Sequence, residues 1–126
     1  MASSPEYAKY PNHKVELEPK PERVRAMFGG EAIADSERCR LVLESRHDAV
    51  VYFPREDVRM DALEKLTDTT FCPFKGTASY FTVRVGEREA ANAVWSYEDP
   101  FDEVRDLKDY MAFYVDRIDE LTEAPG

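Results

Sequence analysis

The amino-acid sequence predicts a mainly β fold, a small antiparallel barrel or sandwich with one or two short helical turns. Three observations support this prediction: β-branched and aromatic residues gather in short runs, the clearest run alternates apolar and polar residues, and turn residues separate the runs at close spacing. With 126 residues, 43% of them hydrophobic, the chain is long enough for one domain with a core and too short for two ordinary ones. This composition excludes a disordered or collagen-like chain.

The N-terminal segment, residues 1–21, is predicted to be an extended or disordered arm. It is rich in proline and poor in apolar residues, and proline removes a backbone donor and interrupts helical periodicity. We expect the rest of the chain, residues 22–126, to form a single barrel-like domain that ends in an acidic segment. The sequence leaves open whether the arm packs against this domain.

Strand signals follow the arm in pairs. Gly29-Gly30 tolerates positive φ between two short runs and so indicates a hairpin. The clearest strand has apolar side chains on one face and polar ones on the other, and it is closed by Gly86 before a second run that can return antiparallel. The predicted strands are residues 23–28, 31–34, 40–43, 49–53, 77–85 and 89–95.

Two further segments have apolar residues at helical spacing. Over residues 58–66 this spacing predicts a short helix or helical turn. In the second segment we expect a helical turn over residues 101–108, followed by a strand over residues 110–115. Periodicity does not separate strand from helix at such lengths, so both alternatives remain open.

Charge and cysteine content restrict the partners and the compartment. Seventeen basic and 26 acidic residues give a net charge of −9, which disfavours a nucleic-acid partner. No stretch has the length of a membrane-spanning helix, and the N-terminus lacks a signal-peptide core, so we expect a soluble protein without a membrane partner. We expect this protein to be a monomer or a homodimer. A reduced, cytoplasmic pair of cysteines is favoured over a disulfide between Cys39 and Cys72. His13 and His47 have no partners at ligand spacing, so we expect both to be solvated, with no metal and no cofactor.

Residues 69–77 form the first candidate site. Pro73 fixes φ and Gly76 tolerates unusual backbone conformations, so this loop should have a definite shape. Cys72 and Lys75 lie close together in it, and a nearby ammonium favours a thiolate that attacks or contacts a ligand. The structural alternative, a buried cysteine and an exposed lysine beside a tight turn, has more weight because no histidine stands next to Cys72 as a base.

Two other candidate clusters lie at strand ends, where side chains are free to point away from a rigid scaffold. In residues 52–58, Arg55 has the planar fork that holds a carboxylate or phosphate, or else it pairs locally with Asp57. In residues 95–100, Trp95 is the only tryptophan. Together with other aromatic residues it lines a cup for a small ligand or, equally, fills the core.

Four ordered blocks, within about residues 23–120, resemble the domain of unknown function 427 family. The blocks are Tyr52 to Val58, Thr70 to Tyr80, the motif Trp95-Ser96-Tyr97-x-x-Pro100 and the motif Tyr110-x-Ala112-Phe113-Tyr114. The resemblance implies a small, mostly β, barrel-like domain without an established activity, in a family that has sometimes carried a nucleotidyltransferase label. Nucleotidyl transfer usually needs a Gly-Ser phosphate turn and carboxylates that hold Mg²⁺, and this sequence has neither a Gly-Ser pair nor an Asp-x-Asp motif.

The leading hypothesis is a small-molecule binding domain for an anionic or aromatic ligand. The predicted ligand-binding residues are Tyr52, Arg55, Thr70, Cys72, Lys75, Gly76, Tyr80, Trp95 and Tyr97. A second hypothesis is an enzyme, nucleotidyltransferase-like or a thiol-dependent transferase, with Cys72, Lys75 and Asp57 as catalytic candidates. A third is an interaction module that docks a basic protein through the acidic segment and the proline-rich arm.

Overall fold

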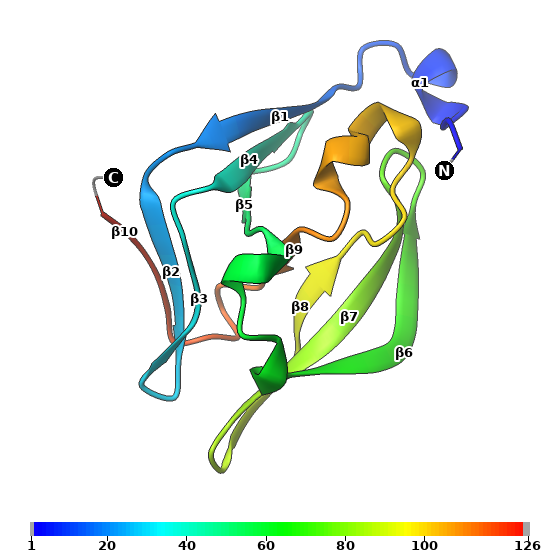
Figure 1. Cartoon of the computed structure of the whole chain (residues 1–126). Helices are drawn as coiled ribbons and strands as arrows, with labels where there is room; N and C mark the ends of the chain where they lie inside the picture. The colour runs from blue at the N-terminus through cyan, green and yellow to red at the C-terminus, as the bar shows by residue number, and fades with distance from the viewer. Residues whose placement is uncertain (1, 125–126) are drawn as a thin grey trace.

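The computed structural model describes residues 2–124, in which ten strands form three antiparallel sheets (Figure 1). The sheet orders are β1-β4-β5, β10-β2-β3 and β6-β7-β8-β9. The strands are β1 (Val15–Lys20), β2 (Arg23–Phe28), β3 (Glu31–Ser36), β4 (Cys39–Glu44), β5 (Val50–Tyr52), β6 (Leu63–Cys72), β7 (Gly76–Val85), β8 (Arg88–Ser96), β9 (Met111–Phe113) and β10 (Glu120–Ala124). The predicted mainly β, antiparallel fold is confirmed, in the form of a sandwich rather than one closed barrel.

Helical structure in the described residues is confined to short turns. These are α1 (Glu6–Lys9) and the 3₁₀ turns η1 (Arg55–Asp57), η2 (Met60–Ala62) and η3 (Asp102–Leu107). None of them is long and apolar enough to cross a membrane. The helical turn predicted over residues 101–108 is confirmed by η3, and the strand predicted after it is confirmed by β9.

The core is divided between two clusters of buried side chains. The larger one lies between the β10-β2-β3 sheet and the β6-β7-β8-β9 sheet, which face each other across the molecule in Figure 1, and it includes Ile33, Phe53 and Val83. The smaller one joins the β1-β4-β5 sheet to β7 and β8 through residues such as Tyr52 and Tyr97. Two of its six buried residues are aromatic, and the partly buried rings of Tyr80, Trp95 and Tyr110 pack against it.

The predicted hairpins follow the local turn signals. Residues 23–28 and 31–34 fall in β2 and β3, and both glycines between these strands have positive φ, as a two-residue hairpin turn requires. The β7–β8 pair is antiparallel, as predicted, and β4 also pairs antiparallel with β5.

The segment from residue 58 onward agrees with its prediction only in part. The predicted helical turn is present as η2, but no longer helix forms over residues 58–66, because β6 begins at Leu63. The register of β6 against β7 shifts between Lys65 and Thr69, so the apolar residues of β6 do not follow the two-residue spacing of a regular strand. The predicted loop at residues 69–77 is therefore the end of a hairpin, in which only residues 73–75 lie between the strands.

The predicted N-terminal arm contains α1 and β1, and β1 pairs antiparallel with β4 from Val15–Glu44 to Lys20–Cys39. The segment thus packs on the domain, a question that the sequence left open. At the other end, β10 pairs with β2, although no strand was predicted there. Residue 1 of the predicted arm and residues 125–126 of the predicted domain lie outside the described residues.

Candidate functional site

Five aromatic side chains converge on a pocket of about 230 Å³ beside the smaller core cluster. The rings belong to Tyr52, Tyr80, Trp95, Tyr97 and Tyr114. Val42 and Val50 complete the apolar wall, and Glu44, His47, Asp48 and Lys75 provide the polar groups. The pocket thus combines an aromatic interior with a charged end, which is the usual composition of a small-ligand site.

Strand register explains why the rings meet. Tyr80 on β7 is paired directly with Trp95 on β8, and directly opposed residues of an antiparallel pair have neighbouring side chains. Tyr52 comes from β5, in a different sheet, and its ring stands edge-on to Trp95 with a centroid separation of 6.1 Å. On the other side of Trp95, the Tyr114 ring lies at 4.5 Å with an interplanar angle of 44°.

Hydrogen bonds fix the orientation of these rings. The indole Nε1 of Trp95 donates to the Tyr52 hydroxyl at 2.9 Å. The Tyr80 hydroxyl is 2.6 Å from the Thr70 hydroxyl across the β6–β7 hairpin. Burial raises the pKa of Tyr52 and of Tyr97 above that of an ordinary phenol, so both hydroxyls remain protonated and neither acts as a base near neutral pH.

Glu44 organises the charged end of the pocket. Its carboxylate, only 7% exposed, binds the Lys75 ammonium, and its Oε2 lies 2.9 Å from His13 Nε2 and 3.8 Å from His47 Nε2. Burial alone would raise the pKa of Glu44, but the hydrogen bonds from Lys75 and His13 outweigh it and hold this pKa below its usual value. The Lys75 ammonium also lies over the Tyr97 ring, 5.8 Å from its centroid.

The sequence predicts a solvated His13, and this prediction is wrong. The His13 side chain is only 17% exposed, and its ring stacks on Phe74 with centroids 3.9 Å apart in addition to its contact with Glu44. The prediction was wrong because β1 brings the N-terminal segment alongside β4, a long-range pairing that residue spacing does not show. His47 is 62% exposed, so its predicted solvation is confirmed.

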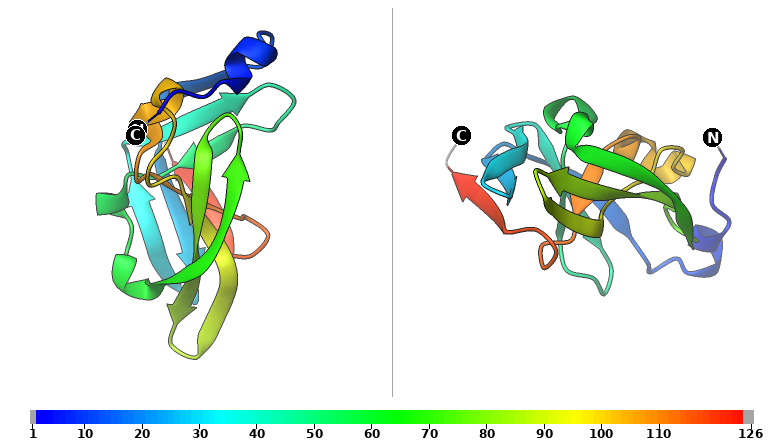
Figure 2. Two further views of the ribbon diagram at one scale, coloured as in Figure 1. Left: turned by 90° about the vertical axis from the view of Figure 1, so that its right-hand side faces the viewer. Right: turned by 90° about the horizontal axis from the view of Figure 1, so that it is seen from below.

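The N-terminal segment also holds the turn that carries Lys75. The Ser4 hydroxyl donates to the Pro73 carbonyl, and the Tyr7 hydroxyl donates to the Phe74 carbonyl at 2.7 Å. Figure 2 shows α1, the β4–β5 turn and the β6–β7 turn at the same end of the molecule. Two hydrogen bonds from the segment before β1 thus reach the turn that carries Lys75.

The structure brings five of the nine predicted ligand-binding residues into the pocket wall: Tyr52, Lys75, Tyr80, Trp95 and Tyr97. Thr70 reaches the pocket only through its contact with Tyr80, and Cys72 packs against the same apolar cluster. Gly76 has a backbone role, because its φ is +115° and an added Cβ would lie 3.4 Å from the Asp99 carbonyl oxygen.

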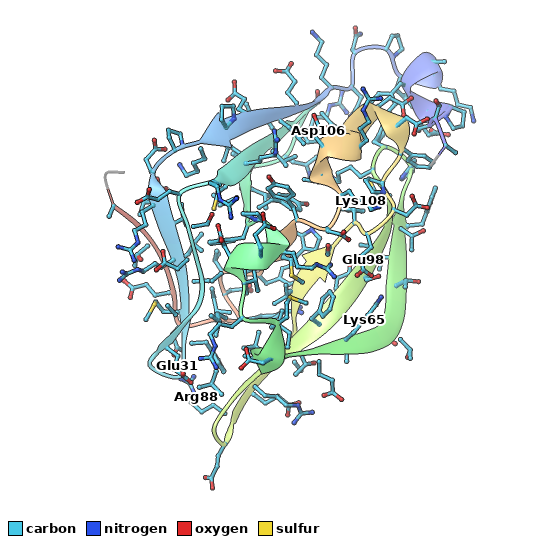
Figure 3. All side chains as sticks on the ribbon, viewed as in Figure 1. Glu31, Lys65, Arg88, Glu98, Asp106 and Lys108 are labelled. Carbon is cyan, nitrogen blue, oxygen red and sulfur yellow. The ribbon has the colours of Figure 1, made fainter. Side chains whose placement is uncertain are left out.

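Arg55 does not line the pocket. Its guanidinium donates to Glu98 at 2.9 Å, to the Ser96 hydroxyl at 3.1 Å and to the Asp109 carbonyl at 3.2 Å. Figure 3 shows Glu98 beside Lys65, with which it forms a second ion pair at 2.6 Å. Arg55 therefore connects the end of β8 to the segment before β9.

The catalytic candidates Cys72, Lys75 and Asp57 are not assembled into one reactive group. Asp57 accepts hydrogen bonds from the Ser36 hydroxyl at 2.6 Å and from Arg38 at 3.0 Å, so its predicted pairing with Arg55 is also absent from the described contacts. Within residues 2–124, no histidine is hydrogen-bonded to Cys72. A thiol without a neighbouring base is a poor catalytic nucleophile.

Both cysteines are free thiols. Cys39 is buried in the larger core cluster, and burial raises its pKa to about 11, which keeps the thiol protonated and unreactive. In the described part of the chain, no three His, Cys, Asp or Glu side chains are gathered in a way that would hold a metal ion.

Three polar pocket residues were not identified from the sequence: Glu44 at the end of β4, and His47 and Asp48 in the turn that follows it. The available signal was the polar turn between two short predicted strands. That signal gave no reason to prefer Glu44 among 26 acidic residues, because its role depends on Lys75 and His13, which lie 31 residues away on either side.

Comparison with known proteins gives one family. A model of the family described as "Domain of unknown function (DUF427)" matches residues 16–124. This match takes in every strand from the second residue of β1 to the end of β10, so it contains the whole pocket and leaves out α1. No curated protein matches the chain.

Proposed function

The chain belongs to the DUF427 family, and from its pocket we propose that it is a small-molecule binding domain. The observation that carries the proposal is the convergence of five aromatic rings, from separate segments, on one pocket with charged groups at its end. A purely structural role would bury these rings, but Tyr80, Trp95 and Tyr114 are only half-buried. Incompletely covered aromatic faces are typical of binding sites.

The size of the pocket favours a small ligand. Its volume of about 230 Å³ lies below the range of roughly 300–1,000 Å³ that is usual for drug-sized ligands. A nucleoside triphosphate is a larger molecule with several negative charges. The volume therefore supports the binding of a small ring or headgroup better than it supports a nucleotidyltransferase.

The contacts of Lys75 and Arg55 give the anionic alternative for the ligand little support. Both cations that were expected to hold an anion have carboxylate partners: Lys75 binds Glu44, and Arg55 binds Glu98 away from the pocket. For the enzyme hypothesis, the separate contacts of Cys72 and Asp57 give no support. The cytoplasmic location, the monomeric or dimeric state and the lack of a nucleic-acid partner stay predictions.

Trp95 provides the direct test, because it is the only tryptophan and lines the pocket. The protein is titrated with organic cations, neutral aromatics, small carboxylates and a nucleoside triphosphate with Mg²⁺, and Trp95 fluorescence is followed. We expect a saturable change with at least one class of small ligand and none with the nucleotide. Silence across all classes, or a response to the nucleotide alone, would contradict the proposal.

A matched pair of variants locates the binding. Tyr80→Ala should weaken the affinity for the responding ligand about tenfold, because an aromatic contact contributes about 1.4 kcal/mol. Tyr10→Ala is the control, since Tyr10 is 58% exposed and lies outside this pocket. Circular dichroism confirms that both variants fold, and equal affinities in the two would place the ligand elsewhere.

A further inference from the structure

We propose that the ligand of this pocket is a small organic cation with a methylated or quaternary ammonium group. The inference rests on the proposed function and adds the charge class of the ligand. It follows from the charges of the lining residues, the hydrogen bonds that the pocket has already formed and the angles between its rings.

With histidine counted as neutral, the formal charges of the pocket side chains sum to −1, because Glu44 and Asp48 are acidic and Lys75 is basic. The Lys75 charge is compensated by Glu44. Asp48 is exposed at the pocket and forms no ion pair with any residue between 2 and 124, so one carboxylate remains for a cation.

Three polar side chains of the pocket already have hydrogen-bond partners. Trp95 Nε1 donates to Tyr52 at 2.9 Å, the Lys75 ammonium donates to Glu44, and the Tyr80 hydroxyl is bonded to Thr70 at 2.6 Å. An anionic ligand would compete with these existing partners for the same donors. A quaternary ammonium requires no donor, because it is held by π faces and carboxylates.

The rings form walls in different directions. Trp95 meets Tyr52 at 88° and Tyr114 at 44°, so the three faces do not form the parallel slot that would clamp a flat ring. Differently inclined π faces suit a rounded, tetrahedral group of methyls. The chain's own Lys75 ammonium, 5.8 Å from the Tyr97 centroid, already uses one ring of this pocket for a cation.

The charge class is tested with three probes of small size. Choline is the cation, 3,3-dimethylbutan-1-ol is its neutral isostere and benzoate is an anion. Binding is measured by isothermal titration calorimetry and by Trp95 fluorescence. We expect choline to saturate the site, the neutral isostere to bind at least tenfold more weakly, and benzoate to give no saturable signal.

Matched charge variants assign the effect to the pocket. Asp48→Asn should weaken choline binding about threefold or more, without changing the affinity for the neutral isostere. Glu87→Gln is the control, because Glu87 lies exposed in the β7–β8 turn, outside the pocket, and the substitution removes the same charge. Equal effects of the two substitutions would mean that choline affinity follows the net charge of the chain and not Asp48, and would overturn the assignment.

The outcomes separate this inference from the proposed function. If the neutral isostere binds within twofold of choline, or if benzoate binds more tightly, the cation inference is wrong and small-molecule binding stands. If no probe and no member of the wider ligand panel alters Trp95 fluorescence, the proposed function itself fails. Tight binding of choline that the Tyr80→Ala substitution does not weaken would place the cation at another site.

Discussion

Lys75 and Arg55 each bind a glutamate, but only Lys75 does so beside a pocket. The Lys75–Glu44 pair is deeply placed, with side chains 13% and 7% exposed, whereas those of the Arg55–Glu98 pair are 28% and 26% exposed. Arg55 uses its planar fork to join backbone and side-chain oxygens of its own chain. The difference shows that a cation at a strand end does not by itself indicate a pocket, because the partners of Arg55 lie away from the pocket while those of Lys75 line it.

The largest expected effect comes from breaking the deeper pair. Glu44→Ala leaves the Lys75 ammonium and His13 without their common partner in a buried position, and removal of one member of a buried ion pair costs about 3 kcal/mol. Urea unfolding should therefore show a free energy of unfolding lower by that amount. Glu98→Ala is the matched control, with an expected loss of about 1 kcal/mol for a more exposed pair. Equal losses would remove the distinction between the two clusters.

The pH dependence of stability gives a second test of the buried Lys75–Glu44 pair. The folded state holds the pKa of Glu44 below its ordinary value of 4.5, so ionised Glu44 stabilises the protein fully above that pH. This contribution is lost as the pH falls through the lowered, folded-state pKa. The difference in unfolding free energy between the wild type and Glu44→Gln should accordingly shrink on acidification below about 4.5. A difference that grows in this range would contradict the assigned role of Glu44.

The elements that could be predicted from the sequence are those with local signals. Gly29-Gly30 indicates the β2–β3 hairpin, and the alternating side chains of β7 indicate its strand. The sequence does not indicate β6, because the register of this strand against β7 shifts between Lys65 and Thr69 and interrupts the regular alternation of its side chains. The sequence does not indicate β1 either, because Pro19 argues against a strand. The strand tolerates this proline because β1 lies at the edge of its sheet, where a missing N–H costs little.

The same limit applies to the candidate site. Tyr80 and Trp95 could be grouped because they occupy consecutive predicted strands that return antiparallel. Lys75 lies in the pocket wall, as expected. Its partner Glu44 could not be predicted, because the pairing depends on how two separate sheets approach each other. The place of Arg55 outside the pocket has the same physical reason, since Glu98 and Asp109 meet it only in the folded chain.

Substitution of Arg55 gives a smaller effect than substitution of Glu44, and one of a different kind. Arg55→Ala removes hydrogen bonds to Glu98, Ser96 and the Asp109 carbonyl, so we expect a loss of about 2 kcal/mol in unfolding free energy. The affinity for the probe that saturates Trp95 fluorescence should stay within twofold of the wild-type value. A large loss of affinity in a folded variant would return Arg55 to the list of ligand-binding residues.

The smallest effect tests whether the N-terminal segment supports the pocket. Tyr7→Phe removes the hydroxyl that donates to the Phe74 carbonyl and keeps the ring contact with Phe74, so about 1 kcal/mol should be lost. Burial, followed by the nearby Glu103 charge, raises the pKa of Tyr7 to about 12, so the donor is intact throughout the neutral range and the loss should not vary with pH there.

The control for this effect is Tyr10→Phe, because the Tyr10 ring also meets Phe74 but its hydroxyl has no hydrogen-bond partner within the described residues. Hydrogen exchange of the Lys75 amide, which is bonded to the Cys72 carbonyl at 3.2 Å, reports on the turn itself. Faster exchange in Tyr7→Phe alone would show that the segment before β1 restrains the turn that carries Lys75. Equal exchange in both variants would mean that the β6–β7 hairpin holds this turn unaided, and that the pocket is complete within the residues matched by the family.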